Sequence, residues 1–438
     1  MVHKSTFPGL LRAKTPAPPL TPIGVGRGPA DLLQFRSERK LGRVFFDGSR
    51  AVMTSARCRV RQFVWLLLAV GLIPATVAGQ PGDSRLRVFG YLQGSFYYQA
   101  NVKNSESATT FTTQQLNILM QKNLARRWRG FVNLAFTNTY SSYRNWGTFS
   151  IEEAWVGYRK HRYLNLKMGL LIPRFNYLNE YRNRMPVLPY IIRPLAYETS
   201  FQEDVPIEDL VPQRAFVQLY GSTRRSEFEF DYAAYAGNSP DVNSDPNQGN
   251  TGVDFKTSAL FGGRIGFEYS LLKAGFSATH DEIDELSGLS PDSLTQSAAS
   301  QFEDTPRVRL GGDLRIEYRD ISFWAEVISV QYDDGIPDVN VDQAFWYATL
   351  GNKFFDRLFI FGTYWDTGIN QAQWTEDKGW ESANVKIKIP GVGVAYYMHD
   401  QTITLKAGVA WVRIDIDYPI PYPERKFNHY SLAISVMF

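Results

Sequence analysis

Cysteine is almost absent from this chain, which has a single one, Cys58, in 438 residues. Cys58 precedes the apolar run Phe63–Ile73, whereas a lipoprotein acylation site would follow such a run. The chain beyond the run therefore has no thiol for a disulfide or a cysteine metal site. A Gly-rich phosphate loop and an HExxH zinc motif are missing as well. The sequence thus predicts neither a cofactor nor a bound metal.

No apolar run is long enough to cross a bilayer as a helix, which takes about 20 residues. The run Phe63–Ile73 has 11 residues. A basic flank at Arg57–Arg61 precedes it, and small residues at Thr76–Gly79 follow. This layout is typical of a secretory signal peptide, which we predict over residues 53–78. A buried core helix is the alternative interpretation.

Residues 1–52 are rich in Pro and Arg and show no clear helix or strand period. Met53 comes just before the basic flank, where a signal peptide should begin. We therefore predict that Met53 is the true initiator and that residues 1–52 are a mis-called extension. A genuine disordered extension is the alternative.

Positive charge is scarce outside this N-terminal part. The whole chain has a formal net charge of +3, but residues 1–78 hold twelve Lys and Arg against three acidic residues. Removing their +9 leaves residues 79–438 with a net charge of −6. The basic character of the full sequence therefore gives no reason to expect a nucleic-acid partner.

Helix-period segments are hard to find in residues 79–438, whereas a period of two recurs. In the first segment Leu86, Val88 and Leu92 fall on one face, and Gln93 and Ser95 fall on the other. This alternation is typical of a strand with one apolar face. We predict sixteen strands, near residues 85–102, 110–123, 128–140, 149–160, 163–171, 214–222, 226–237, 260–270, 272–281, 306–319, 321–333, 342–352, 357–367, 383–398, 402–415 and 428–438.

The lengths of the predicted links alternate. Links after even strands are short, as at 124–127 and 319–321, while links after odd strands are mostly long and polar, as at 238–259, 281–305 and 368–382. An outer-membrane barrel has short periplasmic turns at one end and longer external loops at the other. Because hydrocarbon leaves a free strand edge unsatisfied, such strands must close into a barrel. We therefore predict an all-β, antiparallel transmembrane barrel of about sixteen strands over residues 79–438.

The chain ends on an alternating strand, Asn428–Phe438, whose one face carries Tyr430, Leu432 and Ile434. This ending resembles the C-terminal strand of Gram-negative outer-membrane barrels, whose terminal Phe belongs to the signal for barrel assembly. The resemblance implies export to the outer membrane, contact with its lipid and recognition by the barrel-assembly machinery. We expect the strand to pair with Leu86–Val102 and to close the barrel.

The longest predicted link, Ile172–Gln213, differs from the others in composition. It carries apolar residues, six prolines and paired charges, where an external loop would be richer in Gly and Ser. Since sixteen strands leave an aqueous lumen, we predict that this third long link folds inward and narrows it. The predicted constriction residues are Arg174, Asn179, Glu180, Arg182, Arg184, Arg193, Glu198, Glu203 and Asp204.

One predicted strand near 306–319 carries a ladder of arginines on its lumen face. Guanidinium groups suit carboxylate and phosphate solutes. The alternative is that Asp313 and Glu317 neutralise the arginines in a structural network. The predicted pore-wall residues are Arg307, Arg309, Asp313, Arg315, Glu317 and Arg319.

The stretch GLLIPRFNYLNEYRNR at 169–184, followed by PYIIRPLAYE at 189–198, resembles the segment after the fifth strand in phosphate-selective porins of the O and P type. The resemblance implies a sixteen-stranded, homotrimeric porin with an inward loop. Phosphate selectivity does not carry over, because the lysine-rich loop and the regular arginine ladder expected of that selectivity are not evident.

Three short patterns suggest other chemistry. Asp241–Asp245 has the oxygen spacing of a calcium loop, but Pro246 stands where the motif needs Gly. His429 and Ser431 share a strand face, and His280–Glu282 lies near a strand end, so each offers residues for a rim active site. We favour a solvated loop for the first pattern and ordinary strand residues for the other two.

The first strand begins a few residues after the predicted cleavage site, which leaves no room for the plug of a TonB-dependent transporter. The sequence therefore predicts an outer-membrane porin, a passive channel for ions and small hydrophilic solutes, and not an enzyme. An outer-membrane enzyme with a rim site and a non-conducting structural or adhesive barrel are the alternatives.

Overall fold

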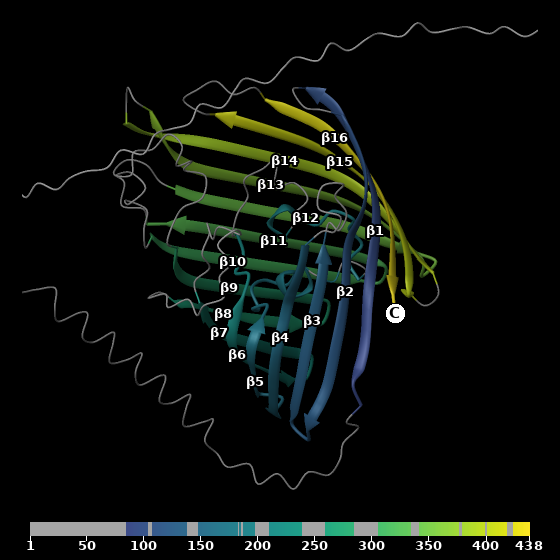
Figure 1. The fold of residues 1–438 in the computed structure, drawn as a ribbon, viewed down its shortest axis with the longest axis vertical. Coiled ribbons are helices and arrows are strands. Elements are labelled where there is room, and N and C mark those ends of the chain that lie inside the picture. Colours follow the sequence, from purple (N-terminus) through teal and green to yellow (C-terminus); the bar gives the residue numbers. More distant parts are fainter. Residues whose placement is uncertain are drawn as a thin grey trace, which may run out of the picture. The chain divides into compact units, whose positions relative to one another are not determined.

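The computed structural model describes residues 85–103, 107–137, 148–182, 184, 187–197, 210–238, 259–283, 305–333, 341–375, 379–398, 401–417 and 424–438. These residues form sixteen strands, which Figure 1 labels in chain order. The strands are β1 (Arg87–Lys103), β2 (Ala108–Ala125), β3 (Trp128–Thr137), β4 (Thr148–His161), β5 (Leu164–Leu171), β6 (Ala215–Arg225), β7 (Phe228–Asn238), β8 (Ala259–Tyr269), β9 (Leu272–Ile283), β10 (Thr305–Tyr318), β11 (Ile321–Tyr332), β12 (Val341–Phe354), β13 (Leu358–Thr375), β14 (Gly379–Met398), β15 (Ile403–Asp417) and β16 (Arg425–Met437).

The strands form one closed antiparallel barrel in which each strand pairs with its neighbours in the chain. The closing pair is β1 with β16, in the register Tyr91↔Met437 to Tyr98↔Tyr430. Phe438 extends this ladder, since its backbone exchanges two hydrogen bonds with Gly90, at 2.8 and 3.0 Å. The predicted strand number and the predicted closure by the last strand are both confirmed.

In the described part of the chain, no helix has the length and apolar character that a membrane span requires.

Side chains alternate between the two faces of the barrel as the sequence predicts. On β16, Leu432 and Ile434 are about half exposed on the outer face, whereas Ser431, Ala433 and Ser435 are buried inside. Apolar side chains on the outside would be costly in water but are stabilised by hydrocarbon, so this pattern fits a wall facing lipid.

Six short turns join the strands at one end, at 126–127, 162–163, 226–227, 270–271, 319–320 and 355–357, and β14 and β15 are separated there by residues 399–402. Several contain a residue with positive φ, such as Ser226, Ser270 and Arg319. A positive φ at a tight turn suits the right-handed twist of the strands that it joins. The prediction of short links after even strands is confirmed.

One predicted link is wrong. We expected a long polar loop over 368–382, but β13 and β14 continue through it and remain paired from Gly368↔Lys386 to Thr375↔Gly379. Only residues 376–378 separate the two strands. Polar residues such as Asn370 hid this extension, because a strand that leaves the lipid layer no longer needs an apolar outer face.

Candidate functional site

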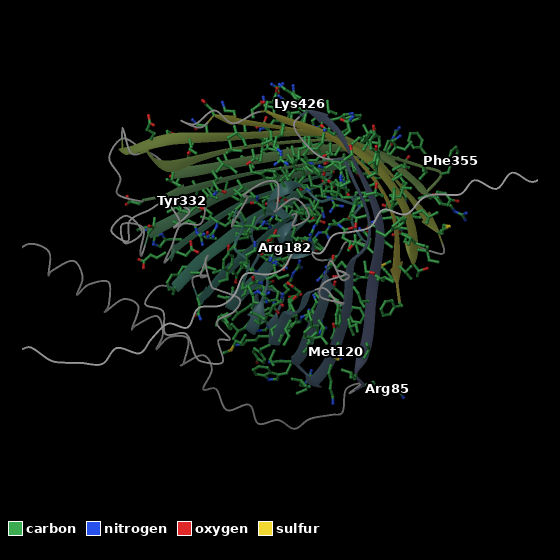
Figure 2. The ribbon with its side chains drawn as sticks, turned by 45° about the horizontal axis from the view of Figure 1, so that its top comes forward. Arg85, Met120, Arg182, Tyr332, Phe355 and Lys426 are labelled. Carbon is green, nitrogen blue, oxygen red and sulfur yellow. The ribbon has the colours of Figure 1, made fainter. Side chains whose placement is uncertain are left out.

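The long link between β5 and β6 enters the barrel, and we call its described residues, 172–182, 184, 187–197 and 210–213, the lumen segment. Near its start, the backbone N–H of Asn176 donates to the Ser277 hydroxyl of β9 at 2.9 Å. Further on, the Tyr190 hydroxyl donates to Thr349 of β12 at 2.9 Å, and Gln114 of β2 donates to the Ile191 carbonyl at 2.9 Å. These partners come from strands on different sides of the wall, so the segment crosses the lumen. Figure 2 labels its Arg182 within the barrel.

One side of the lumen segment is apolar. Its Tyr190, Ile191 and Ile192 are almost fully buried in a single cluster with the inward side chains of β11–β16. The Tyr190 ring meets Phe361 edge to face, with centroids 5.4 Å apart. Burying an apolar side chain of this size stabilises the folded state by about 1.5–3 kcal/mol relative to leaving it exposed. The packing therefore fixes the segment against β11–β16 and leaves its other side toward the remaining wall.

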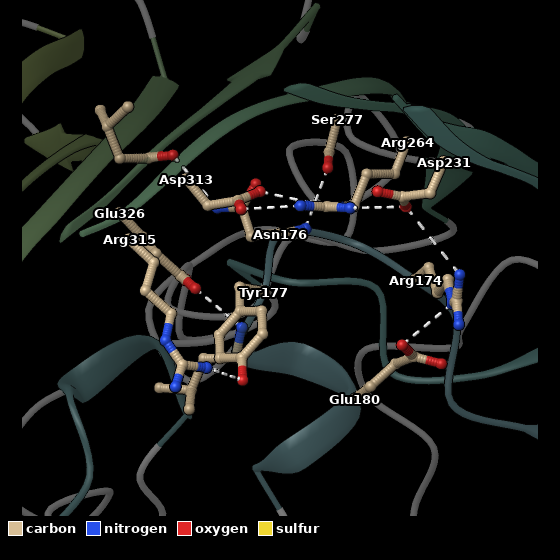
Figure 3. Close-up of polar contacts among 12 residues, drawn as sticks. Arg174, Asn176, Tyr177, Glu180, Asp231, Arg264, Ser277, Asp313, Arg315 and Glu326 are labelled. Carbon is tan, nitrogen blue, oxygen red and sulfur yellow. Dashed lines mark hydrogen bonds and ion pairs between the residues drawn. The ribbon is translucent and has the colours of Figure 1, made fainter. Parts of the chain in front are cut away.

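The other side of the segment is charged (Figure 3). Arg174 lies 2.9 Å from Glu180 within the segment and 4.0 Å from Asp231 of β7. Asp231 also pairs with Arg264 of β8 at 3.1 Å, and Arg264 pairs in turn with Asp313 of β10 at 2.7 Å. Opposite charges thus alternate from the segment onto the facing wall.

Aromatic rings border this charged strip. The guanidinium of Arg174 lies 5.1 Å from the ring centre of Tyr220, and the Lys167 ammonium lies 4.9 Å from that of Trp155. On the β10 side, Arg315 donates to the Tyr177 hydroxyl and pairs with Glu317. A cation over a ring face is attracted to it, so these rings hold the cationic groups in place.

The charges also set the ionisation of Glu180. Burial alone would raise its pKa, but the nearby Arg174 and Lys167 more than compensate, and the pKa of Glu180 lies below its ordinary value. Glu180 is therefore a carboxylate at neutral pH. For Arg182 the effect of burial dominates, and it lowers the pKa of this guanidinium to about 10.

Three predicted constriction residues tie the segment together instead of facing open space. Asn179 in η1 (Asn179–Tyr181) is fully buried, and its amide donates to the carbonyls of Pro173 at 2.9 Å and Pro212 at 3.2 Å. It thereby joins the two ends of the segment. Arg182 donates to Asn179 Oδ1 at 3.1 Å, and Arg193 donates to the Arg182 carbonyl at 2.5 Å.

The structure places the remaining predicted residues as follows. Arg184 is exposed, with its guanidinium 5.2 Å from the Tyr181 ring centre. Arg319 does not belong to the arginine ladder, because it lies in the turn after β10 and stacks on Tyr318 at 5.2 Å. Glu198, Glu203 and Asp204 lie outside the described residues.

Arg307 and Arg309, at the lower-numbered end of the ladder, pair with an unexpected partner. Arg307 and Arg309 are 0% and 1% exposed and share Asp281 of β9, at 2.6 and 2.9 Å. The alternative interpretation of this strand was a network in which Asp313 and Glu317 neutralise the arginines. Arg315 pairs with Glu317, whereas Asp313 pairs with Arg264 and Asp281 takes its place beside Arg307 and Arg309. The pairing follows from the register, which sets Arg307 directly opposite Asp281.

No family model matches the chain, and no curated sequence matches it. Among solved structures, OprB of Pseudomonas putida has 9% identity and a TM-score of 0.53, with 81% of this chain and 94% of that one covered. The anion-selective porin from Comamonas acidovorans has 10% identity and a TM-score of 0.52, with 81% and 100% covered. OmpT of Vibrio cholerae has 9% identity and a TM-score of 0.52, with 82% and 100% covered.

The chain has the fold of a porin-type outer-membrane barrel. At such low identity the likeness concerns the fold alone, so membership of the phosphate-selective family stays a prediction.

Four inward-facing charged residues of the strands were not predicted from the sequence, namely Lys167, Arg264, Asp281 and Glu326. Each falls on the inward face of its strand, so strand parity was the available signal. Parity could not select them, because a sixteen-stranded wall has many inward polar residues and their partners are set by the register between strands.

The structure describes the residues of two of the three competing patterns. Asp281 is fully buried with Arg307 and Arg309, whereas the neighbouring His280 is exposed. Ser431 donates to the Gly408 carbonyl at 3.3 Å. No group of His, Cys, Asp or Glu that could hold a metal occurs in the described part of the chain. The Asp241–Asp245 loop lies outside it.

Proposed function

We propose that this chain is an outer-membrane porin, a passive channel for ions and small hydrophilic solutes that catalyses no reaction. The observation that carries the proposal is the lumen segment, which is fixed to β11–β16 on its apolar side and presents charges toward β5–β10 on the other. A passage bordered by Arg174, Glu180 and Asp231 would select solutes by charge and size. The alternating signs favour weak ion selectivity over a strong anion preference.

The test is conductance of the purified, refolded chain in planar bilayers. A porin gives stepwise, ohmic current increments, and a reversal potential in a salt gradient then reports the sign of the selectivity. A chain that inserts but conducts no ions would contradict the proposal and favour a structural barrel.

The homotrimer and recognition by the assembly machinery also stay proposals. One solved V. cholerae OmpT structure is described as a trimer form, at 8% identity and a TM-score of 0.50. Light scattering of the detergent-solubilised protein would measure the number of chains directly.

Arg174→Gln is expected to shift selectivity toward cations. The substitution removes the positive charge between Glu180 and Asp231 and leaves both carboxylates. A unit charge at contact distance in water is worth about 1 kcal/mol, so we expect roughly a fivefold change in the permeability ratio. The measurement is the reversal potential. Arg225→Gln, at an exposed position beside a short turn, is the matched control and should leave the ratio unchanged.

Low pH should shift the ion selectivity of the channel toward anions. The pKa of Glu180 is lowered by Arg174 and Lys167, so its charge is fully present above the ordinary value of about 4.3 and is lost as pH falls through the lower folded value. Protonation of Glu180 leaves the positive charges of Arg174 and Lys167 in place. The preference of the channel for anions should therefore increase below about pH 4. A titration of reversal potential in Glu180→Gln should lack this step and start from the anion-shifted value. If the step persists in Glu180→Gln, another carboxylate causes it.

A further inference from the structure

Four cations form a continuous row across four neighbouring strands. Lys388 of β14 pairs in register with Arg413 of β15, Arg413 pairs with Lys426 of β16, and Lys426 pairs with Lys103 of β1. We call these four residues the basic row. Among the described residues, no second row of four cations crosses adjacent strands.

The basic row lies on the outer face of the barrel. The residues that alternate with it, such as Ile387, Val412 and Phe427, are at most 3% exposed and point inward. The side chains of Arg413 and Lys103 are 53% and 51% exposed. Figure 2 labels Lys426 at the edge of the barrel. The row therefore takes no part in the lumen.

The row begins where the apolar outer surface ends. Along β15 the outward residues are Leu405, Val409 and Trp411, and Arg413 comes next. On β16 the outward Leu432 and Tyr430 likewise precede Lys426 toward the long-link end. Exposed Trp and Tyr mark the level at which hydrocarbon gives way to headgroups. The basic row stands just beyond that level.

An anionic oxygen group already sits among these cations. Glu424 lies 2.8 Å from Lys103, 2.7 Å from Lys426 and 3.0 Å from Arg413. Hydrogen bonds from the two lysines hold the pKa of Glu424 at about 2. Asp415 adds a second carboxylate beside Arg413 at 3.0 Å. Glu424 and Asp415 are thus carboxylates in contact with three of the four cations of the row.

We propose that the basic row binds the phosphate groups of an anionic lipid in the outer leaflet. The proposal rests on the proposed function for one point, that the long-link end of the barrel faces outward. Strands about 4.8 Å apart give a four-strand row a width of about 14 Å, enough for a headgroup with two separated phosphates. Arginine binds phosphate through its planar fork and lysine through a compact charge. Acyl chains of the same lipid would lie against Val409 and Leu432 below.

The test compares the whole chain with the variant Lys388→Gln/Arg413→Gln/Lys426→Gln. The probe is a bisphosphorylated glucosamine-disaccharide acyl lipid, offered in detergent and counted as retained lipid by native mass spectrometry. We expect retention at least tenfold weaker in the variant, because each surface cation contributes about 1 kcal/mol toward an anionic lipid. The control Lys122→Gln/Lys160→Gln/Arg225→Gln removes as many exposed charges near the short-turn end and should retain the lipid normally.

Other outcomes would overturn the proposal. Equal retention by the variant, or equal retention of the dephosphorylated lipid, would remove the basic row as a phosphate site. Displacement of the lipid by millimolar inorganic phosphate would identify a site for the free anion instead. Conductance measured on the same samples keeps the two proposals separate, since the variant should conduct like the unchanged chain, and a loss of conductance in all samples would count against the porin function only.

Discussion

Asp281→Ala is expected to destabilise the barrel by about 3–5 kcal/mol, the usual cost of removing one partner from a buried ion pair. Asp281 receives hydrogen bonds from Arg307 Nε at 3.0 Å and Nη2 at 2.6 Å, and from Arg309 Nη1 at 2.9 Å. All three side chains are at most 1% exposed. Alanine would deprive two buried guanidinium groups of this carboxylate.

The measurement is the thermal transition of the detergent-folded barrel, followed by loss of β-sheet circular dichroism. Asp356→Ala is the matched control, because its side chain is 94% exposed in a turn and should leave the transition unchanged. The triple variant Asp281→Leu/Arg307→Met/Arg309→Met removes charge from both sides and should recover most of the loss. If Asp281→Ala melts like the unchanged chain, the network does not stabilise the fold.

The same network shows how far the sequence could predict this molecule. Strand number, closure and facing followed from alternation, because one wall of a barrel faces lipid and a period of two is then imposed on every strand. The arginine ladder was visible for the same reason. Its partner was not, because Asp281 lies on another strand and only the register brings it opposite Arg307.

The lumen segment was predicted from composition, whereas the roles of its residues depended on its path. Arg174 and Arg182 are eight positions apart and chemically identical. Arg174 reaches Glu180 and the wall residue Asp231, while Arg182 is turned inward onto Asn179 and the Gln213 carbonyl. No periodic pattern distinguishes the two, since the segment is irregular and prolines interrupt it. Burial within the folded segment decides which charge meets solvent.

Glu326 of β11 is the residue whose replacement should most change the channel. Its carboxyl oxygens accept hydrogen bonds from the Leu178 backbone amide at 2.7 Å and from the Tyr197 hydroxyl of η2 (Leu195–Tyr197) at 2.5 Å. It thus holds two distant points of the lumen segment with one side chain that is 4% exposed. Glu326→Ala leaves both donors buried without this acceptor, at about 1–3 kcal/mol for each.

We expect Glu326→Ala to keep a folded barrel but to release the segment from the wall. Single-channel current should then become noisy, with larger and variable increments, and trypsin should cut after the exposed Arg184 faster than in the unchanged chain. Glu326→Gln is the matched control. Its amide oxygen still accepts a hydrogen bond in the same place, so its current and its cleavage rate should lie close to those of the unchanged chain. Steady current and slow cleavage in Glu326→Ala would show that apolar packing against β11–β16 holds the segment without Glu326, because every other contact of the segment is intact in that variant.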